Sequence, residues 1–369
     1  MFVFWCLIFL SACVLAYQLS LHAALEVLVD QREASKAKAL DTCLIVVFKD
    51  ESSLLPGLLD DLVQLKANEI SCFLVDDHST DEGPELVRSF ATDHEHLMYQ
   101  RLPDDVHGKK AGLHHVLSRV NAEYILLTDA DCSIPNAGFV ERMRSALAAG
   151  ADLVVGSGLM HVPATWIGQS YAHITLQQHV LFHAAIAWKL PYMAVGRSMA
   201  FRLDAYKASG AMSGHLSHSS GTDDLLLQDF VRAGMRIVSR PDALTYSYAP
   251  ISLSAWVKQR SRHLSVGDRY PIQVLLMIWT TAMLPILFTL ACVLFFFYQP
   301  FTLLGILSLF ILLLLTKLTD IILMQFLDAA RVQLYRQYLP WLDVVVSSVN
   351  ALISAMAASR MPKQWTRRT

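Results

Sequence analysis

The sequence predicts an α/β domain with a mainly parallel sheet, combined with apolar, membrane-spanning helices near both ends of the chain. Between residues 42 and 249, short continuously apolar runs alternate with segments that carry leucines at helical spacing. This alternation is typical of a parallel sheet with helices on both faces. Of the 369 residues, 54% are hydrophobic and only 17% are charged, whereas soluble domains carry about 25% charged residues. Part of the chain is therefore expected to lie in lipid.

The first apolar stretch covers residues 1–20 and carries no charge. Its length just suffices to cross the hydrocarbon core as a helix, and we interpret it as a transmembrane anchor. A cleaved signal peptide and a lipoprotein cleavage site at residues 10–13 are the alternatives. No basic residue precedes Arg32, which argues against a signal peptide. Because Arg32, Lys36 and Lys38 follow the stretch, the positive-inside rule places the next domain in the cytoplasm.

A second apolar region, residues 272–358, forms the predicted C-terminal membrane region. Residues 272–298 and 301–327 are each long enough to span a bilayer, and only two residues separate them. They are therefore predicted to form a helical hairpin, with basic residues on both flanks keeping its ends inside. Residues 338–358 form a weaker candidate. If that segment spans, the basic tail lies outside, against the positive-inside rule, so a re-entrant or interfacial segment is the alternative.

Acidic residues follow two of the predicted strands directly. Asp76 and Asp77 end the strand at residues 71–75, and Asp129 and Asp131 end the strand at residues 124–128. Open α/β sheets bind ligands at the carboxyl ends of their strands, and Mg²⁺ prefers carboxylate and phosphate oxygens. No GxGxxG follows the first strand, which counts against a dinucleotide cofactor. The formal net charge of -2 gives no sign of the basic surface that nucleic-acid binding requires.

Five short motifs follow one another in this region: VDDHSTD at 75–81, HGKKAGL at 107–113, DAD at 129–131, TDDLL at 222–226 and QRSRH at 259–263. In their order and spacing the chain resembles the family 2 glycosyltransferases, which have the GT-A fold. It is most similar to membrane-integrated members such as cellulose synthase and glucosylceramide synthase. The resemblance extends roughly from residue 43 to residue 269, and it implies a GT-A domain at residues 42–270.

The resemblance implies a role for each matching residue. It assigns donor binding to acidic and polar residues at the strand ends and to basic residues nearby: Asp50, Glu51, Asp76, Asp77, Lys109, Asp129, Gln259 and Arg262. Asp131 is the implied ligand of Mg²⁺ or Mn²⁺, and Asp224 is the implied general base. His263 stands where the family usually has Trp, which argues against processive polymer synthesis.

The implied activity is hexosyl transfer from a nucleotide-diphospho-sugar, a UDP-sugar being favoured, to an acceptor hydroxyl by inverting single displacement. The last motif ends only nine residues before residue 272, and residues 171–188 have the composition of an interfacial helix. We therefore expect a lipid-linked or membrane-embedded acceptor and a cytoplasmic catalytic domain at a bacterial inner membrane. A nucleotidyl- or phosphosugar-transferase and an inactive membrane scaffold are the alternative functions.

Overall fold

The computed structural model describes residues 2–30, 41–65, 70–135, 138–161, 165–216, 221–250, 252–264, 270–299 and 302–330. The chain divides into two compact units. An α/β unit contains Asp30–His161 and Pro191–Ala249, and a helical unit contains Met1–Val29, Val162–Leu190 and Pro250–Met361. The predicted segment at residues 338–358 lies outside the described residues.

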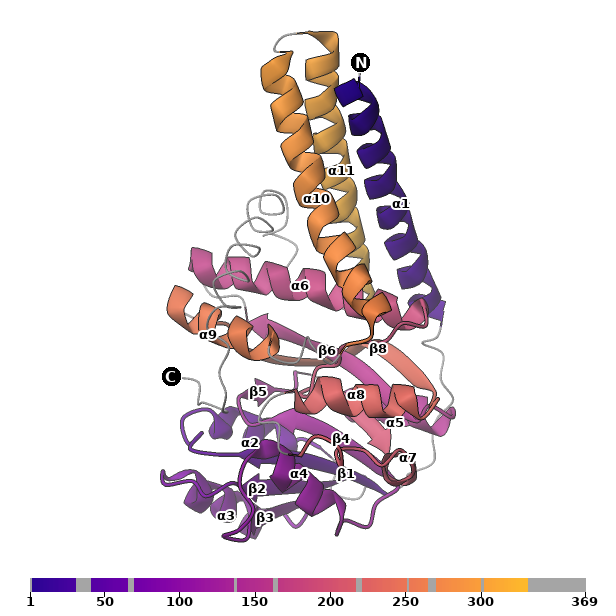
Figure 1. Ribbon diagram of the computed structural model, residues 1–369. Helices are drawn as coiled ribbons and strands as arrows, with labels where there is room; N and C mark the ends of the chain where they lie inside the picture. Colours follow the sequence, from indigo (N-terminus) through magenta and orange to yellow (C-terminus); the bar gives the residue numbers. More distant parts are fainter. Residues whose placement is uncertain are drawn as a thin grey trace. The chain divides into compact units, whose positions relative to one another are not determined.

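The α/β unit is built on an eight-stranded sheet in the order β3-β2-β1-β4-β7-β6-β8-β5 (Figure 1). The strands are β1 (Thr42–Phe48), β2 (Ser71–Asp76), β3 (Leu97–Arg101), β4 (Tyr124–Asp129), β5 (Cys132–Ser133), β6 (Leu153–His161), β7 (Met199–Arg202) and β8 (Ile237–Tyr248). Strands β3, β2, β1 and β4 are parallel neighbours, as are β6 and β8. β7 runs antiparallel between β4 and β6, and β5 pairs antiparallel with β8. The predicted α/β fold with a mainly parallel sheet is confirmed.

Helices cover both faces of this sheet. On one face, α2 (Leu55–Val63), α3 (Gly83–Asp93) and α5 (Gly138–Ala148) bury their apolar side chains against alternate residues of β1, β2 and β4, including Leu44, Val46 and Leu126. The other face carries α4 (Lys109–Leu117), α7 (Leu203–Ala208) and α8 (Thr222–Arg232). There, Gly112 of α4 lies against Val47, and Phe201 of β7 contacts Tyr206 and Phe230. The central strands are thus apolar on both faces, which explains their continuous hydrophobic runs.

The backbone of β6 leaves no room for a side chain at Gly156. A Cβ atom at this position would lie 2.1 Å from Ser198 Oγ, 2.5 Å from the backbone oxygen of Ala243 and 2.6 Å from Met143 Cε. We expect Gly156→Ala to lower the free energy of unfolding by about 1–3 kcal/mol, because backbone of β8 must move. Gly57→Ala is the matched control, since no heavy atom lies within 4 Å of the added methyl group. Thermal unfolding of the two variants checks this, and an unchanged midpoint for Gly156→Ala would contradict it.

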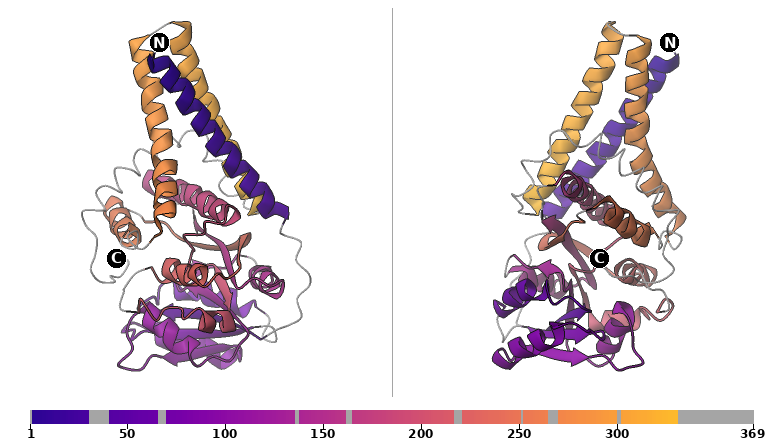
Figure 2. Two further views of the ribbon diagram at one scale, coloured as in Figure 1. Left: turned by 45° about the vertical axis from the view of Figure 1, so that its right-hand side comes forward. Right: turned by 90° about the vertical axis from the view of Figure 1, so that its left-hand side faces the viewer.

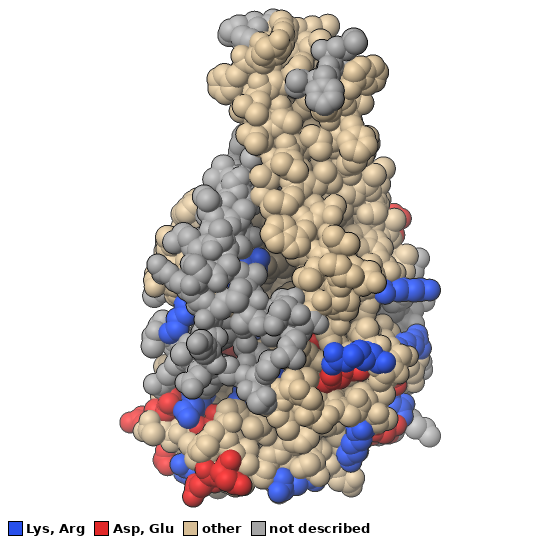
Figure 3. Space-filling view, viewed as in Figure 1, with Lys and Arg blue, Asp and Glu red and all other residues tan. Residues whose placement is uncertain are grey.

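In the described part of the helical unit, three helices are long and apolar enough to cross a membrane: Trp5–Leu28 within α1 (Phe2–Asp30), all of α10 (Ile272–Tyr298), and Leu303–Leu327 within α11 (Leu303–Ala329). The three helices lie side by side (Figures 1 and 2). α10 and α11 form the predicted helical hairpin, and α1 continues well beyond the predicted anchor. Large apolar side chains are exposed along them, including Phe9, Trp279 and Phe297. Figure 3 shows uncharged residues along α10 on the face in view, a surface suited to lipid.

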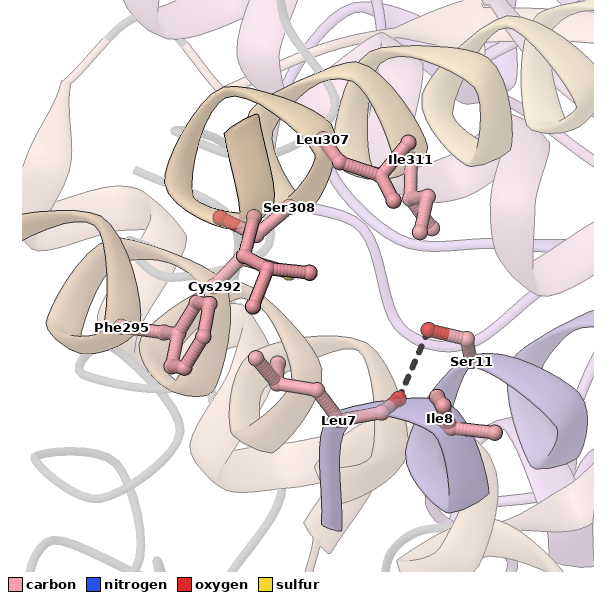
Figure 4. Close-up of a pocket in the computed structure, with 9 residues that line it drawn as sticks. Leu7, Ile8, Ser11, Cys292, Phe295, Leu307, Ser308 and Ile311 are labelled. Atoms are coloured by element: carbon pink, nitrogen blue, oxygen red, sulfur yellow. Dashed lines mark hydrogen bonds between the residues drawn. The ribbon is translucent and has the colours of Figure 1, made fainter. Parts of the chain in front are cut away.

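The bundle interior is mainly apolar with a few polar contacts. Leu7 and Val14 of α1 pack with Phe288 and Phe295 of α10 and Leu315 of α11. One small cavity between these helices is lined by Leu7, Ile8, Ser11, Cys292, Phe295, Leu304, Leu307, Ser308 and Ile311 (Figure 4). Its lining offers few polar atoms, so it is a packing defect of the bundle and not a substrate site.

The described residues of the helical unit include two further helices. α6 (Trp166–Ala187) packs on α11, where the ring of His183 lies 5.5 Å from that of Phe326. α9 (Leu253–Leu264) contacts α6 through Trp256, whose ring meets that of Tyr171 edge-on at 5.6 Å. α6 covers the stretch that was predicted to be an interfacial helix, and most of its side chains are buried.

Candidate active site

The candidate site lies where β1, β2 and β4 end, at one edge of the sheet. In the strand register Phe48 is paired with Asp76, and Val47 is paired with Asp129. The parallel strands therefore end level with one another, and the acids that follow them share one edge, as the sequence predicted. Asp129 and Asp131 are partly exposed there, whereas Asp76 and Asp77 are buried.

Asp76 is held by a set of hydrogen bonds within the turn. Its Oδ1 accepts a hydrogen bond from the backbone N–H of Ser79 at 2.7 Å. Its Oδ2 accepts hydrogen bonds from the hydroxyl of Tyr99 at 3.0 Å and from Nη1 of Arg101 at 3.2 Å. Burial and the neighbouring Asp76 carboxylate raise the pKa of Tyr99, which keeps its hydroxyl a donor. The carboxylate is thus fixed in orientation by groups on β3.

Asp50 connects the ends of β1 and β2. Its backbone has a φ of 51°, a left-handed conformation that is uncommon outside glycine. Its Oδ1 accepts hydrogen bonds from the backbone N–H and the hydroxyl of Thr80, at 2.7 and 3.0 Å, and its own N–H donates to Ser79 Oγ at 2.9 Å. Glu51 begins the turn into α2, since its carbonyl accepts the N–H groups of Leu54 and Leu55. Both residues therefore shape the rim of the site.

Lys109 and Asp129 form an ion pair across the site. Lys109 is the first residue of α4, Asp129 is the last residue of β4, and each side chain is about one third exposed. The pair brings the second and third sequence motifs into contact. Asp131 lies two residues further on, partly exposed, and its Oδ1 accepts a weak hydrogen bond from Cys132 Sγ at 3.6 Å. It is a partly exposed carboxylate two residues from the Lys109–Asp129 ion pair.

Asp223 and Asp224 lie in the first turn of α8 and hold the loop that precedes β7. Asp223 Oδ2 accepts the N–H of Gly196 at 2.9 Å, and its Oδ1 accepts the N–H of Asp224 at 3.1 Å. Asp224 Oδ1 accepts the N–H of Ala194 at 3.2 Å. Negative charge is also favourable at a helix N-terminus. Both oxygens of Asp223 thus accept backbone N–H groups.

Gln259 and Arg262 both lie on α9, in the helical unit. The other predicted site residues lie in the α/β unit. The roles that the family resemblance gives to Gln259 and Arg262 stay predictions.

Sequence reasoning missed several residues that shape the site. Tyr99 and Arg101 orient Asp76 from a neighbouring strand, and Asp81 accepts the N–H groups of Ser52 and Gly83 at 2.8 and 3.1 Å. Asp81 stands inside the second-strand motif, where the spacing could have marked it as a turn residue. No local pattern marks Tyr99 or Arg101, because their partner is more than 20 residues away.

Comparison with known protein families finds a match for part of the chain. The family model described as Glycosyl transferase family 2 matches residues 43–207. A search of curated protein sequences found no match. The matched residues include both pairs of acids at the strand ends and Lys109.

Solved structures resemble the chain at low identity. A mannosyltransferase from Pyrobaculum calidifontis, in complex with GDP-Man and Mn²⁺, is 17% identical with a TM-score of 0.51, covering 93% of this chain and 99% of that one. The S. aureus TarS 1-349 structure is 14% identical with a TM-score of 0.43, covering 85% and 92%. Glucosyl-3-phosphoglycerate synthase from Mycobacterium tuberculosis is 14% identical with a TM-score of 0.42, covering 61% and 79%.

The α/β unit has a GT-A fold, similar to that of the mannosyltransferase. Residues 43–207 are similar to the Glycosyl transferase family 2. This similarity favours glycosyl transfer over nucleotidyl transfer as the reaction.

Proposed function

We propose that this chain transfers a hexosyl group from a nucleotide-diphospho-sugar to a hydroxyl of a lipid-linked or membrane-embedded acceptor, with inversion at the anomeric carbon. The observation that carries the proposal is the convergence of acids from β1, β2 and β4 beside Lys109, within a family 2 domain. The mannosyltransferase with the same fold was solved with GDP-Man and Mn²⁺. A UDP-sugar stays the donor predicted from the sequence motifs.

The residues at the rim fit a hard divalent cation. Asp131 offers carboxylate oxygens at the partly exposed edge of the sheet, and Mg²⁺ and Mn²⁺ are suited to oxygen ligands. Asp129 is paired with Lys109 and is assigned to the donor instead. A divalent ion held by Asp131 would neutralise charge on the departing diphosphate.

Lys109, Arg262 and Asp224 are assigned to charge stabilisation and proton transfer. Lys109 lies at the first turn of α4, where its ammonium group can stabilise the diphosphate as negative charge develops; Arg262 is assigned the same task by resemblance. Asp224 accepts the proton of the acceptor hydroxyl while that oxygen bonds to the anomeric carbon. The bond from that carbon to the diphosphate breaks, and the nucleoside diphosphate leaves. General-base assistance of this kind is worth about 10²–10⁴-fold in rate.

The three long apolar helices support an integral membrane location. The basic residues that follow residue 30 and flank the hairpin favour a cytoplasmic catalytic domain, at an inner membrane if the source is bacterial. α9, which carries Gln259 and Arg262, ends only a few residues before α10, so two residues assigned to donor binding are close in sequence to a membrane span. This arrangement favours an acceptor in the bilayer over a soluble sugar.

Full-length protein in lipid nanodiscs should be given a panel of labelled UDP- and GDP-sugars, together with lipid extract or short soluble glycans. We expect release of nucleoside diphosphate with one donor, its loss with EDTA, and its recovery with Mn²⁺ or Mg²⁺. Label should enter the lipid phase. Release that survives exhaustive chelation would contradict the metal-dependent mechanism, and label found only in water-soluble product would contradict the lipid acceptor. Retention of the donor's anomeric configuration in the product would contradict single displacement.

A further inference from the structure

Three side chains that could bind a metal ion lie together near the acids assigned to the donor. The proposed mechanism does not use the three together. The Asp-His-His cluster consists of Asp77, His78 and His107, and one ligand atom from each lies within 4.8 Å of the others. Asp77 and His78 follow β2, and His107 lies in the loop that leads into α4. The two imidazole rings are 4.5 Å apart between centroids.

One distance within the cluster matches the separation of two ligands of a single ion. Asp77 Oδ1 and His78 Nδ1 are 3.3 Å apart, which is long for a hydrogen bond. Two ligand atoms bound about 2.1 Å from Zn²⁺ at the tetrahedral angle lie about 3.4 Å apart. His78 Nε2 lies 3.8 Å from a carboxylate oxygen of Asp104, and Asp77 Oδ2 accepts the N–H of Gly108 at 3.0 Å. The hydrogen bond from Gly108 fixes the Asp77 carboxylate, as outer partners do for metal ligands in proteins.

Burial and charge also favour a cation here. Asp77 is 1% exposed, and the side chain of His78 is 15% exposed. Among the described residues no Lys or Arg forms an ion pair with Asp77, and a buried carboxylate without a cation is costly. His78 has a φ of 59°, so the backbone turns its ring toward the cluster at some cost in strain. His107 is exposed, which leaves an entry route for an ion from solvent.

We propose that Asp77, His78 and His107 bind one Zn²⁺-class ion, which is distinct from the oxygen-bound ion at Asp131 and which inhibits the enzyme. Imidazole ligands favour Zn²⁺, Co²⁺ or Ni²⁺ over Mg²⁺. Because the proposed function assigns Asp77 to the donor, an ion on its Oδ1 competes with donor binding; this last step rests on that function. The fourth position of the ion is filled by water or a ligand.

Full-length protein without a histidine tag should be titrated with Co²⁺ alone, followed by competition with Zn²⁺. We expect the strong visible absorption of Co²⁺ with nitrogen ligands, at one ion per chain, and its displacement by Zn²⁺. His107→Ala should weaken Zn²⁺ binding at least about 100-fold, since it removes a direct ligand. His94→Ala is the matched control, because this partly exposed histidine lies outside the cluster. An unchanged Co²⁺ spectrum in His107→Ala, or equal losses in both variants, would overturn the proposal.

Two further measurements separate this site from the catalytic one. Asp131→Asn should keep the Co²⁺ absorption, and its loss would place the ion at the catalytic carboxylate and overturn the proposal. Zn²⁺ should reduce donor binding to wild-type protein and to His94→Ala but not to His107→Ala. Equal inhibition of all three would overturn the competition step. The spectrum is read without donor, so failure of the proposed transfer reaction does not affect it.

Discussion

Asp131→Asn is expected to abolish sugar transfer while leaving the fold intact. The asparagine side chain has nearly the same shape, but it removes the negative charge that a divalent ion requires of its ligand. Loss of this electrostatic stabilisation should lower the rate by at least about 100-fold. Asp131 lies partly exposed at the strand edge, where its Oδ1 accepts a weak hydrogen bond from Cys132 Sγ. The free energy of unfolding should therefore change little.

The measurement is nucleoside diphosphate release at saturating donor over a range of Mn²⁺ concentrations, beside a thermal unfolding curve. Asp204→Asn is the matched control in the same α/β unit. Its carboxylate pairs with Arg202 at 2.8 Å on an exposed surface, and that neighbouring guanidinium lowers the pKa of Asp204. Asp204→Asn should transfer sugar at the wild-type rate, because exposed ion pairs contribute little. Activity of Asp131→Asn within about twofold of wild type would contradict its assignment as metal ligand.

The strands with the clearest sequence pattern are the central ones of the sheet. β1, β2 and β4 consist of short, largely apolar runs, which only a central parallel strand requires. β8 lacked that signal, although most of its residues are buried, because Arg240, Pro241 and Asp242 interrupt the apolar pattern. Arg240 and Asp242 satisfy each other inside the fold, with Nε to Oδ1 at 3.0 Å, and Arg142 of α5 also contacts Asp242 at 3.2 Å. A strand stabilised by partners far away in sequence has no local pattern to reveal it.

The candidate site, like the sheet, could be predicted only in part from the sequence. The acids at the ends of β2 and β4 could be found from the sequence, because a strand end is a local feature and parallel strands end at one edge. The groups that orient those acids could not. Asp76 is held by Tyr99 from another strand, and Asp77 meets His107 across about 30 residues of chain. Such contacts arise only when the sheet forms, so motif spacing cannot predict them.

Asp224→Asn is expected to lower turnover by about 10²–10⁴-fold while changing donor affinity little. A general base takes its proton only in the transition state, so its loss should appear in kcat and not in donor binding. We expect the two neighbouring acids to have different tasks. Both oxygens of Asp223 accept backbone N–H groups, whereas Asp224 Oδ1 accepts the N–H of Ala194 at the longer distance of 3.2 Å. Asp223→Asn can keep one of these contacts through its amide oxygen, so its main effect should be on stability.

The two variants therefore make a matched pair, measured by donor titration, single-turnover transfer and thermal unfolding. Asp223→Asn should lower the unfolding midpoint, because a partly buried hydrogen bond to the N–H of Gly196 or Asp224 is weakened, a loss of about 1 kcal/mol. Its turnover should fall far less than that of Asp224→Asn. Raising the pH should not restore Asp224→Asn, since an amide cannot take up a proton in this range. If Asp223→Asn instead abolishes transfer with a normal unfolding curve while Asp224→Asn is mild, the general base is Asp223, and Asp224 is the residue that positions the loop before β7.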